Sequence, residues 1–174
     1  MSSNFLIKYM NKHEMLDYMR GLSDNEYNLL INNIKYLSYE YVKNVDEPYF
    51  LFISNKYNVI ISMMQFNMKS NNWYLNQILN NISKKTIEIA FISTNPQYQN
   101  QWYSKILLDY FFKNYSKDYF FESSYFSDDW KKYLKQNYEK FCKKYNTFIY
   151  VSSLYCLEYD INNIINNKII HKIK

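Results

Sequence analysis

The 174-residue chain contains very little glycine, proline, cysteine and arginine. With a single glycine it cannot build a glycine-rich phosphate loop of the Walker type. Its two cysteines, Cys142 and Cys156, do not have metal-ligand spacing, and its two histidines lie near opposite ends, which argues against a structural zinc site. We expect the thiols to stay reduced, because neither a secretory leader nor a long apolar span is visible and the pattern indicates a cytoplasmic protein.

Positive charge is also limited, and it is carried almost entirely by lysine. The formal net charge is +5, and Arg20 is the only arginine. Nucleic-acid surfaces cluster basic residues and favour arginine for bidentate contacts, whereas these lysines are scattered. A nucleic-acid partner is therefore not expected. Hydrophobic residues make up 48% of the chain and aromatic residues 21%, which favours a packed globular domain.

Local signals predict alternating strands and helices. Short apolar or β-rich runs predict strands at residues 5–10, 49–54, 59–68, 86–93, 119–123 and 147–159. Helical spacing of apolar residues predicts helices at residues 12–20, 23–41 and 102–114 and from residue 127, and leaves 73–82 ambiguous.

The helix boundaries rest on capping chemistry. Asn11 can cap the first helix, and Gly21 can end it. Ser23 and Glu26 have the spacing of a capping box, in which each side chain accepts from the backbone N–H of the other residue. An apolar stripe then continues at helical period to Tyr41, before Pro48 stops any helix.

The resulting order is β-α-α-β-β-β-α-β-α-β, with one further strand left open. Such alternation predicts an α/β fold, a single-domain mixed β-sheet with helices on both faces. We assign residues 1–160 to this domain and residues 161–174 to a tail whose structure, strand or helix, the pattern leaves undecided.

One stretch carries a motif, "NPQYQNQWYSKILL", from Asn95 to Leu108. It joins a predicted strand to a predicted helix. Its proline, aromatic, glutamine and paired aliphatic residues have the spacing of the phosphate-binding loop of the GNAT superfamily of acyl-CoA N-acyltransferases, and the element order of the whole chain is similar too. The sequence thus resembles that superfamily, with a degenerate loop. Trp102 stands where the family usually has a glycine, Asn100 replaces another frequent glycine, and Ser104 keeps a small residue.

Trp102 leaves two interpretations of the loop. Backbone N–H groups at a helix N-terminus lack intrahelical acceptors and attract phosphate whatever the side chains are, provided none is proline. If the indole points away, the loop can still hold a pyrophosphate. If the indole points inward, it fills the cofactor groove.

The resemblance implies acetyl-CoA, or another acyl-CoA, as the cofactor. The residues implied to contact it are Phe91, Ile92 and Ser93 on the strand and Gln99, Asn100, Gln101, Trp102, Tyr103 and Ser104 in the loop. Glu88 is the candidate general base that deprotonates the acceptor amine, the alternative being a solvated glutamate at a sheet edge. Tyr138 is the candidate general acid for the thiolate, with Tyr125 and Tyr133 as further choices.

The resemblance implies an N-acyltransferase, and in the first instance an acetyltransferase, that acts on an amine of a small molecule, peptide or protein. The alternative is a catalytically inactive binding protein on the same scaffold, for example a phage- or plasmid-type factor that docks on a host protein through exposed aromatics. A third reading, a nucleic-acid-modifying relative, would need steeply salt-dependent binding. No membrane partner is expected, and the oligomeric state, a homodimer included, stays open.

Overall fold

The computed structural model describes residues 5–69, 85–123, 140, 143–145 and 149–151. Its contacts divide the chain into two compact units, which are described in turn. The first unit comprises residues 1–67 and 91–111, and the second comprises residues 68–90 and 112–174. Among the described residues, no helix is long and apolar enough to cross a membrane.

Six strands of one mixed sheet follow each other in chain order. Their bounds are β1 Phe5–Asn11, β2 Pro48–Asn55, β3 Ile60–Lys69, β4 Lys85–Thr94, β5 Tyr119–Ser123 and β6 Ile149–Val151. The pairs β1–β2 and β2–β3 are antiparallel, whereas β4–β5 and β5–β6 are parallel. A tight turn closes the β2–β3 hairpin, where the Asn58 backbone N–H donates to the Asn55 carbonyl over 3.0 Å.

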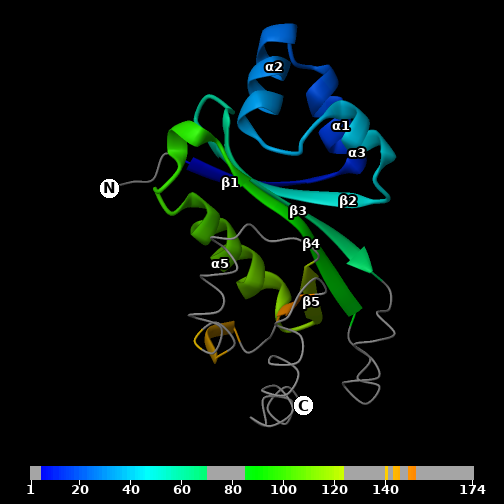
Figure 1. Cartoon of the computed structure of the whole chain (residues 1–174), viewed down its shortest axis with the longest axis vertical. Helices are drawn as coiled ribbons and strands as arrows, with labels where there is room; N and C mark the ends of the chain where they lie inside the picture. Colours follow the sequence, from blue (N-terminus) through cyan, green and yellow to red (C-terminus); the bar gives the residue numbers. More distant parts are fainter. Residues whose placement is uncertain (1–4, 70–84, 124–139, 141–142, 146–148, 152–174) are drawn as a thin grey trace. The chain divides into compact units, whose positions relative to one another are not determined.

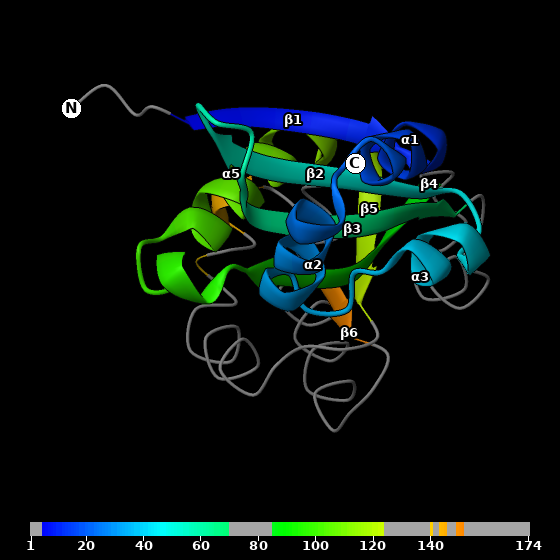
Figure 2. The same cartoon turned by 90° about the horizontal axis from the view of Figure 1, so that it is seen from above.

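In the first unit, three helices cover one face of the strands (Figure 1). They are α1 Lys12–Arg20, α2 Asp24–Asn33 and α3 Tyr39–Asn44. Their buried side chains pack with Phe50 and Phe52 of β2, Met63 of β3 and Phe91 of β4. Figure 2 shows β1, β2 and β3 side by side beneath these helices.

The opposite face of the same strands is covered by α5, Tyr103–Tyr115. Strand residues alternate between faces, so Phe66 of β3 lies on the side away from Met63. Its ring meets Phe111 of α5 edge to face, with centroids 4.9 Å apart. The predicted fold class, a mixed sheet with helices on both faces, is confirmed.

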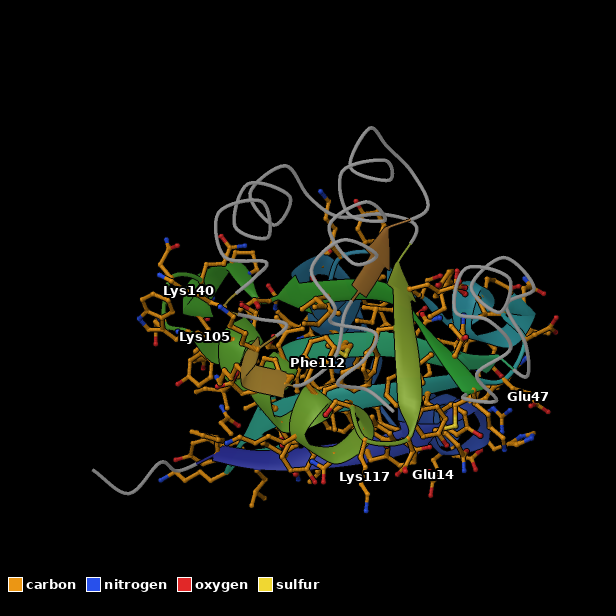
Figure 3. All side chains as sticks on the ribbon, turned by 90° about the horizontal axis from the view of Figure 1, so that it is seen from below. Glu14, Glu47, Lys105, Phe112, Lys117 and Lys140 are labelled. Atoms are coloured by element: carbon orange, nitrogen blue, oxygen red, sulfur yellow. The ribbon has the colours of Figure 1, made fainter. Side chains whose placement is uncertain are left out.

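In the second unit, the first half of β4 pairs with β5, and β5 pairs with β6. Phe112, labelled in Figure 3, packs here against Phe121 of β5 with ring centroids 4.8 Å apart. Tyr145 also packs against Phe112, with ring centroids 5.3 Å apart. Aromatic contacts thus build the core of this unit as well.

The capping predictions are confirmed. Asn11 and Ser23 each form a full capping box, with Glu14 and Glu26 respectively. The Asn11 box was not predicted as such; only the cap was. Gly21 ends α1, although its φ of −77° is an ordinary right-handed value, so the position does not depend on glycine's conformational freedom.

The predicted helix from residue 23 to residue 41 is wrong. α2 ends at Asn33, and a separate helix, α3, begins after Ser38, whose side chain accepts from the Tyr41 N–H. The break occurs because Ile34 turns extended and Tyr36 adopts a left-handed φ of 70°. The predicted helix from residue 127, the ambiguous segment 73–82 and the tail 161–174 lie outside the described residues.

Candidate functional site

The candidate loop begins at Asn95, directly after β4. Asn95 is 2% exposed, and its backbone N–H donates to the Ile61 carbonyl over 2.8 Å. Its side-chain oxygen accepts from the Gln97 N–H, and its carbonyl accepts from the Tyr98 N–H. These bonds close a short 3₁₀ turn, Pro96–Tyr98, in which the proline takes the first position. The loop therefore leaves the sheet in a fixed direction.

Two left-handed residues then shape the loop. Asn100 has a φ of 61° and Trp102 has a φ of 66°, the region that glycine occupies most easily. These are the two positions where the GNAT pattern has its frequent glycines. The backbone therefore takes a glycine-type conformation without glycine.

The loop presents a row of backbone donors. The first N–H of α5 with a recorded acceptor belongs to Ile106, which donates to the Trp102 carbonyl over 2.9 Å. The N–H groups of residues 100–105 meet no acceptor within the described part of the chain. Successive free N–H groups at left-handed bends and at a helix N-terminus attract anions.

The local charge favours the same class of ligand. Lys105, labelled on α5 in Figure 3, is the only charged residue between Asn95 and Leu108. No carboxylate of this segment opposes an anion, and the positive end of the helix dipole adds to the lysine charge.

The Trp102 side chain points outward. It is 69% exposed, and the Lys105 ammonium nitrogen lies 4.9 Å from its ring centroid, as in a cation–π contact. The indole is therefore not packed into the core of its unit. Aromatic packing instead comes from Tyr103, whose ring contacts Phe5 at 6.0 Å and Tyr98 at 6.1 Å.

The strand residues implied to contact the cofactor have different environments. The Phe91 side chain is buried against the helices, whereas Ile92 on the other face is half-buried. Ser93 is 8% exposed; its hydroxyl accepts from the Lys35 N–H over 2.9 Å, and its carbonyl accepts from the Ser62 hydroxyl over 3.2 Å.

The pairing of β4 with β5 includes residues 85–89 and stops before these three residues. Ile89 is the last paired residue, and its partner Ser123 ends β5. The backbone of Phe91, Ile92 and Ser93 thus lies beyond the last β4–β5 pair.

Glu88 lies in the second unit and has a neighbour that the sequence reading missed. In the parallel register of β4 and β5 it pairs with Glu122, which is only 5% exposed. Glu88 is half-buried, on a strand that pairs with β5. The signal for Glu122 was available: like Glu88, it is a lone carboxylate within an apolar strand. Tyr125, Tyr133 and Tyr138 lie outside the described residues.

Within the described ranges, no cluster of three or more His, Cys, Asp or Glu side chains is placed to hold a metal ion.

No protein-family model matches the chain, and no curated protein matches it. Solved structures do match. The matched structures described next are acetyltransferases.

An aminoglycoside acetyltransferase from an uncultured soil metagenomic sample is 13% identical, with a TM-score of 0.49 over 80% of this chain and 88% of its own. The ribosomal-protein-alanine N-acetyltransferase from Brucella melitensis biovar Abortus 2308 is 10% identical, with a TM-score of 0.49 over 76% and 89%. The aminoglycoside N-acetyltransferase AAC(6')-Iy, in complex with CoA, is 14% identical, with a TM-score of 0.48 over 88% and 93%. Identity this low transfers no residue role to this chain.

Proposed function

We propose that the protein is an acyl-CoA-dependent N-acyltransferase, and in the first instance an acetyltransferase. The observation that supports this most strongly is the row of six backbone N–H groups, residues 100–105, which meets no acceptor among the described residues. A pyrophosphate offers oxygens to such a row, and Lys105 adds a positive charge nearby. The Trp102 side chain is exposed and is not buried over this loop.

The hydrogen-bond donors of the loop suit the phosphate oxygens of an acyl-CoA. The loop N–H groups would hold the pyrophosphate, and backbone groups of Phe91, Ile92 and Ser93 would pair with the pantetheine arm. Bound there, the cofactor supplies an activated acyl thioester. The chain's own part is to orient that carbonyl and to exclude water from it.

Proton transfer is assigned to two residues. Glu88 would take a proton from the acceptor ammonium, because only a neutral amine attacks a carbonyl. Tyr138 would donate a proton to the departing thiolate.

The experiment for the proposed function is thermal unfolding with and without ligand. Acetyl-CoA that binds only the folded protein should stabilise it by about 2.7 kcal/mol at a concentration 100 times Kd, which raises the Tm by several degrees. Desulfo-CoA serves as a matched ligand that binds but cannot transfer a group. If neither acetyl-CoA nor longer acyl-CoAs shift the Tm at millimolar concentration, the proposal fails.

The second candidate function is a non-catalytic binding protein. The exposed Trp102 indole favours it, since tryptophan is common in interface hot spots. This function requires no cofactor. It would be favoured over the enzyme if acetyl-CoA left the Tm unchanged and if the protein bound a partner in a Trp102-dependent way. We propose a cytoplasmic location with either function.

A further inference from the structure

β1 lies at the outer edge of the sheet, beside β2, as Figure 2 shows. All seven of its residues pair with β2 on one side, from Phe5 opposite Asn55 to Asn11 opposite Tyr49. Among the described strands, none pairs with β1 on its other side. An edge strand of this kind presents a row of backbone N–H and C=O groups that can hydrogen-bond to a further strand.

The register shows which backbone groups of β1 point away from β2. The Asn55 N–H donates to the Val59 carbonyl over 3.1 Å, so the backbone groups of Asn55 point toward β3. Its partner Phe5 therefore makes no backbone hydrogen bonds to β2, and the groups of Phe5 point outward. Since these directions alternate along a strand, the Ile7 N–H and carbonyl point outward as well.

β1 has few of the features that protect such an edge. Natural edge strands are blocked by proline, by β-bulges or by charged side chains. The sequence of β1, FLIKYMN, has no proline and a single charge, and its pairing with β2 runs without a register shift. That charge, the Lys8 ammonium, donates to the Asn58 side chain over 2.8 Å. Leu6 and Tyr9 are 54% and 44% exposed, so a large apolar side chain flanks the edge on each face.

We propose that β1 is a dimer interface, at which it pairs antiparallel with β1 of a second copy of this chain. The strands β1, β2 and β3 of both copies would then form one continuous antiparallel sheet. Because each copy has one β1, the assembly closes as a two-fold dimer. The second copy is the partner because β1 is complementary to itself in one register.

The backbone and the charges select that register. A two-fold pairing that keeps the α5-side residues of both copies on one face sets one residue of β1 opposite its own copy. Lys8 at this position would place like charges side by side, which is unfavourable. Registers centred beyond Lys8 require Asn11, whose N–H already donates to the Glu14 carboxylate over 2.8 Å. A centre at Leu6 pairs fewer residues of β1, so the centre is Ile7.

Centred on Ile7, the register brings complementary side chains together. Phe5 lies opposite Tyr9 of the second copy, on the face toward α5. On the other face, Leu6 lies opposite Lys8 of the second copy, so that the apolar stem of the lysine covers an exposed leucine. Cross-strand pairs of this kind stabilise a sheet, and the two-fold symmetry makes each of these two pairs occur twice.

Sedimentation equilibrium of the full chain, without any ligand, measures the association directly. A single pair of edge strands buries little surface, so we expect a reversible dimer of twice the 21.5 kDa chain mass, with a Kd of about 1–500 µM. A monomer at every concentration up to about 1 mM would overturn the proposal. Species larger than a dimer would also contradict it, because one β1 per copy allows only a closed pair.

Charge introduced at Leu6 tests the register. Leu6→Lys sets two lysines opposite each other, twice in the dimer, and should raise the Kd about 3- to 30-fold. Leu6→Glu sets a carboxylate opposite Lys8 of the second copy and should lower the Kd about 2- to 10-fold. Tyr57→Lys and Tyr57→Glu are the matched controls, at a 72% exposed site in the β2–β3 turn, and should leave the Kd within about 2-fold. Equal effects of the two Leu6 variants, or no effect of either, would rule out this pairing.

A proline at Ile7 tests the backbone. Ile7→Pro removes the central N–H donor without removing a hydrogen bond to β2, because that N–H points outward. It should weaken the dimer at least about 10-fold, whereas Ile7→Val should stay within about 2-fold of the wild type. A folded Ile7→Pro chain that dimerises like the wild type would exclude β1 as the interface. If this variant does not fold, the two Leu6 variants decide.

Discussion

Replacement of Trp102 tests the loop geometry directly. The residue has a φ of 66°, which costs about 1–2 kcal/mol for any residue other than glycine. Trp102→Ala keeps that cost and removes the indole. Trp102→Gly removes both, but glycine gains about 0.5–1 kcal/mol of freedom in the unfolded chain relative to alanine. The glycine variant should therefore be more stable than the alanine variant by about 0.5–1 kcal/mol.

The loss of the contact between Lys105 and the indole is common to both variants and cancels in their comparison. For a chain of this size the difference corresponds to about 1–4 °C in Tm, measured by calorimetry. Asn100 is a matched second site, where the glycine variant should likewise be more stable than the alanine variant. An alanine variant as stable as the glycine variant would refute the left-handed loop, and with it the row of donors.

Two further predictions concern titratable groups. Glu88→Gln should lower kcat about 10²- to 10⁴-fold while leaving the acetyl-CoA-induced Tm shift unchanged, with Glu122→Gln as the matched neighbour; an unchanged rate in steady-state assays would remove Glu88 as the base. Burial, and secondarily the Glu26 carboxylate, raise the pKa of the Tyr18 phenol. Its stabilising contribution is complete below the unfolded-state pKa and is lost as pH rises through the raised folded-state pKa, so Tyr18→Phe should reduce the alkaline loss of stability in denaturant titrations. Tyr57→Phe, at a 72% exposed site, should not; equal effects would contradict the burial argument.

The sequence predicted those elements whose signals are local. Asn11, Ser23 and Gly21 mark helix ends through contacts within a few residues, and all three were correct. The break after α2 was missed because Ile34 continues the apolar spacing of α2 and is fully buried, although the chain there is no longer helical. Ser38, which caps α3, was the overlooked local signal.

The candidate site was predictable only in part. The turn at Pro96 and the loop spacing are sequence features, and the donor row follows from them. The outward direction of the Trp102 side chain depends on backbone dihedral angles that residue identity does not specify. Glu122 is identified only by its pairing with Glu88 on the neighbouring strand, and strand pairing is set by contacts distant in sequence.

The left-handed backbone at Asn100 and Trp102 has a consequence for how such loops change over time. Since the donors belong to the main chain, substitution of either glycine position alters the side chain and the energetic cost but leaves the donor row. A sequence motif that requires glycine at both positions no longer matches such a loop after two substitutions. A search based on backbone dihedral angles still detects the conformation.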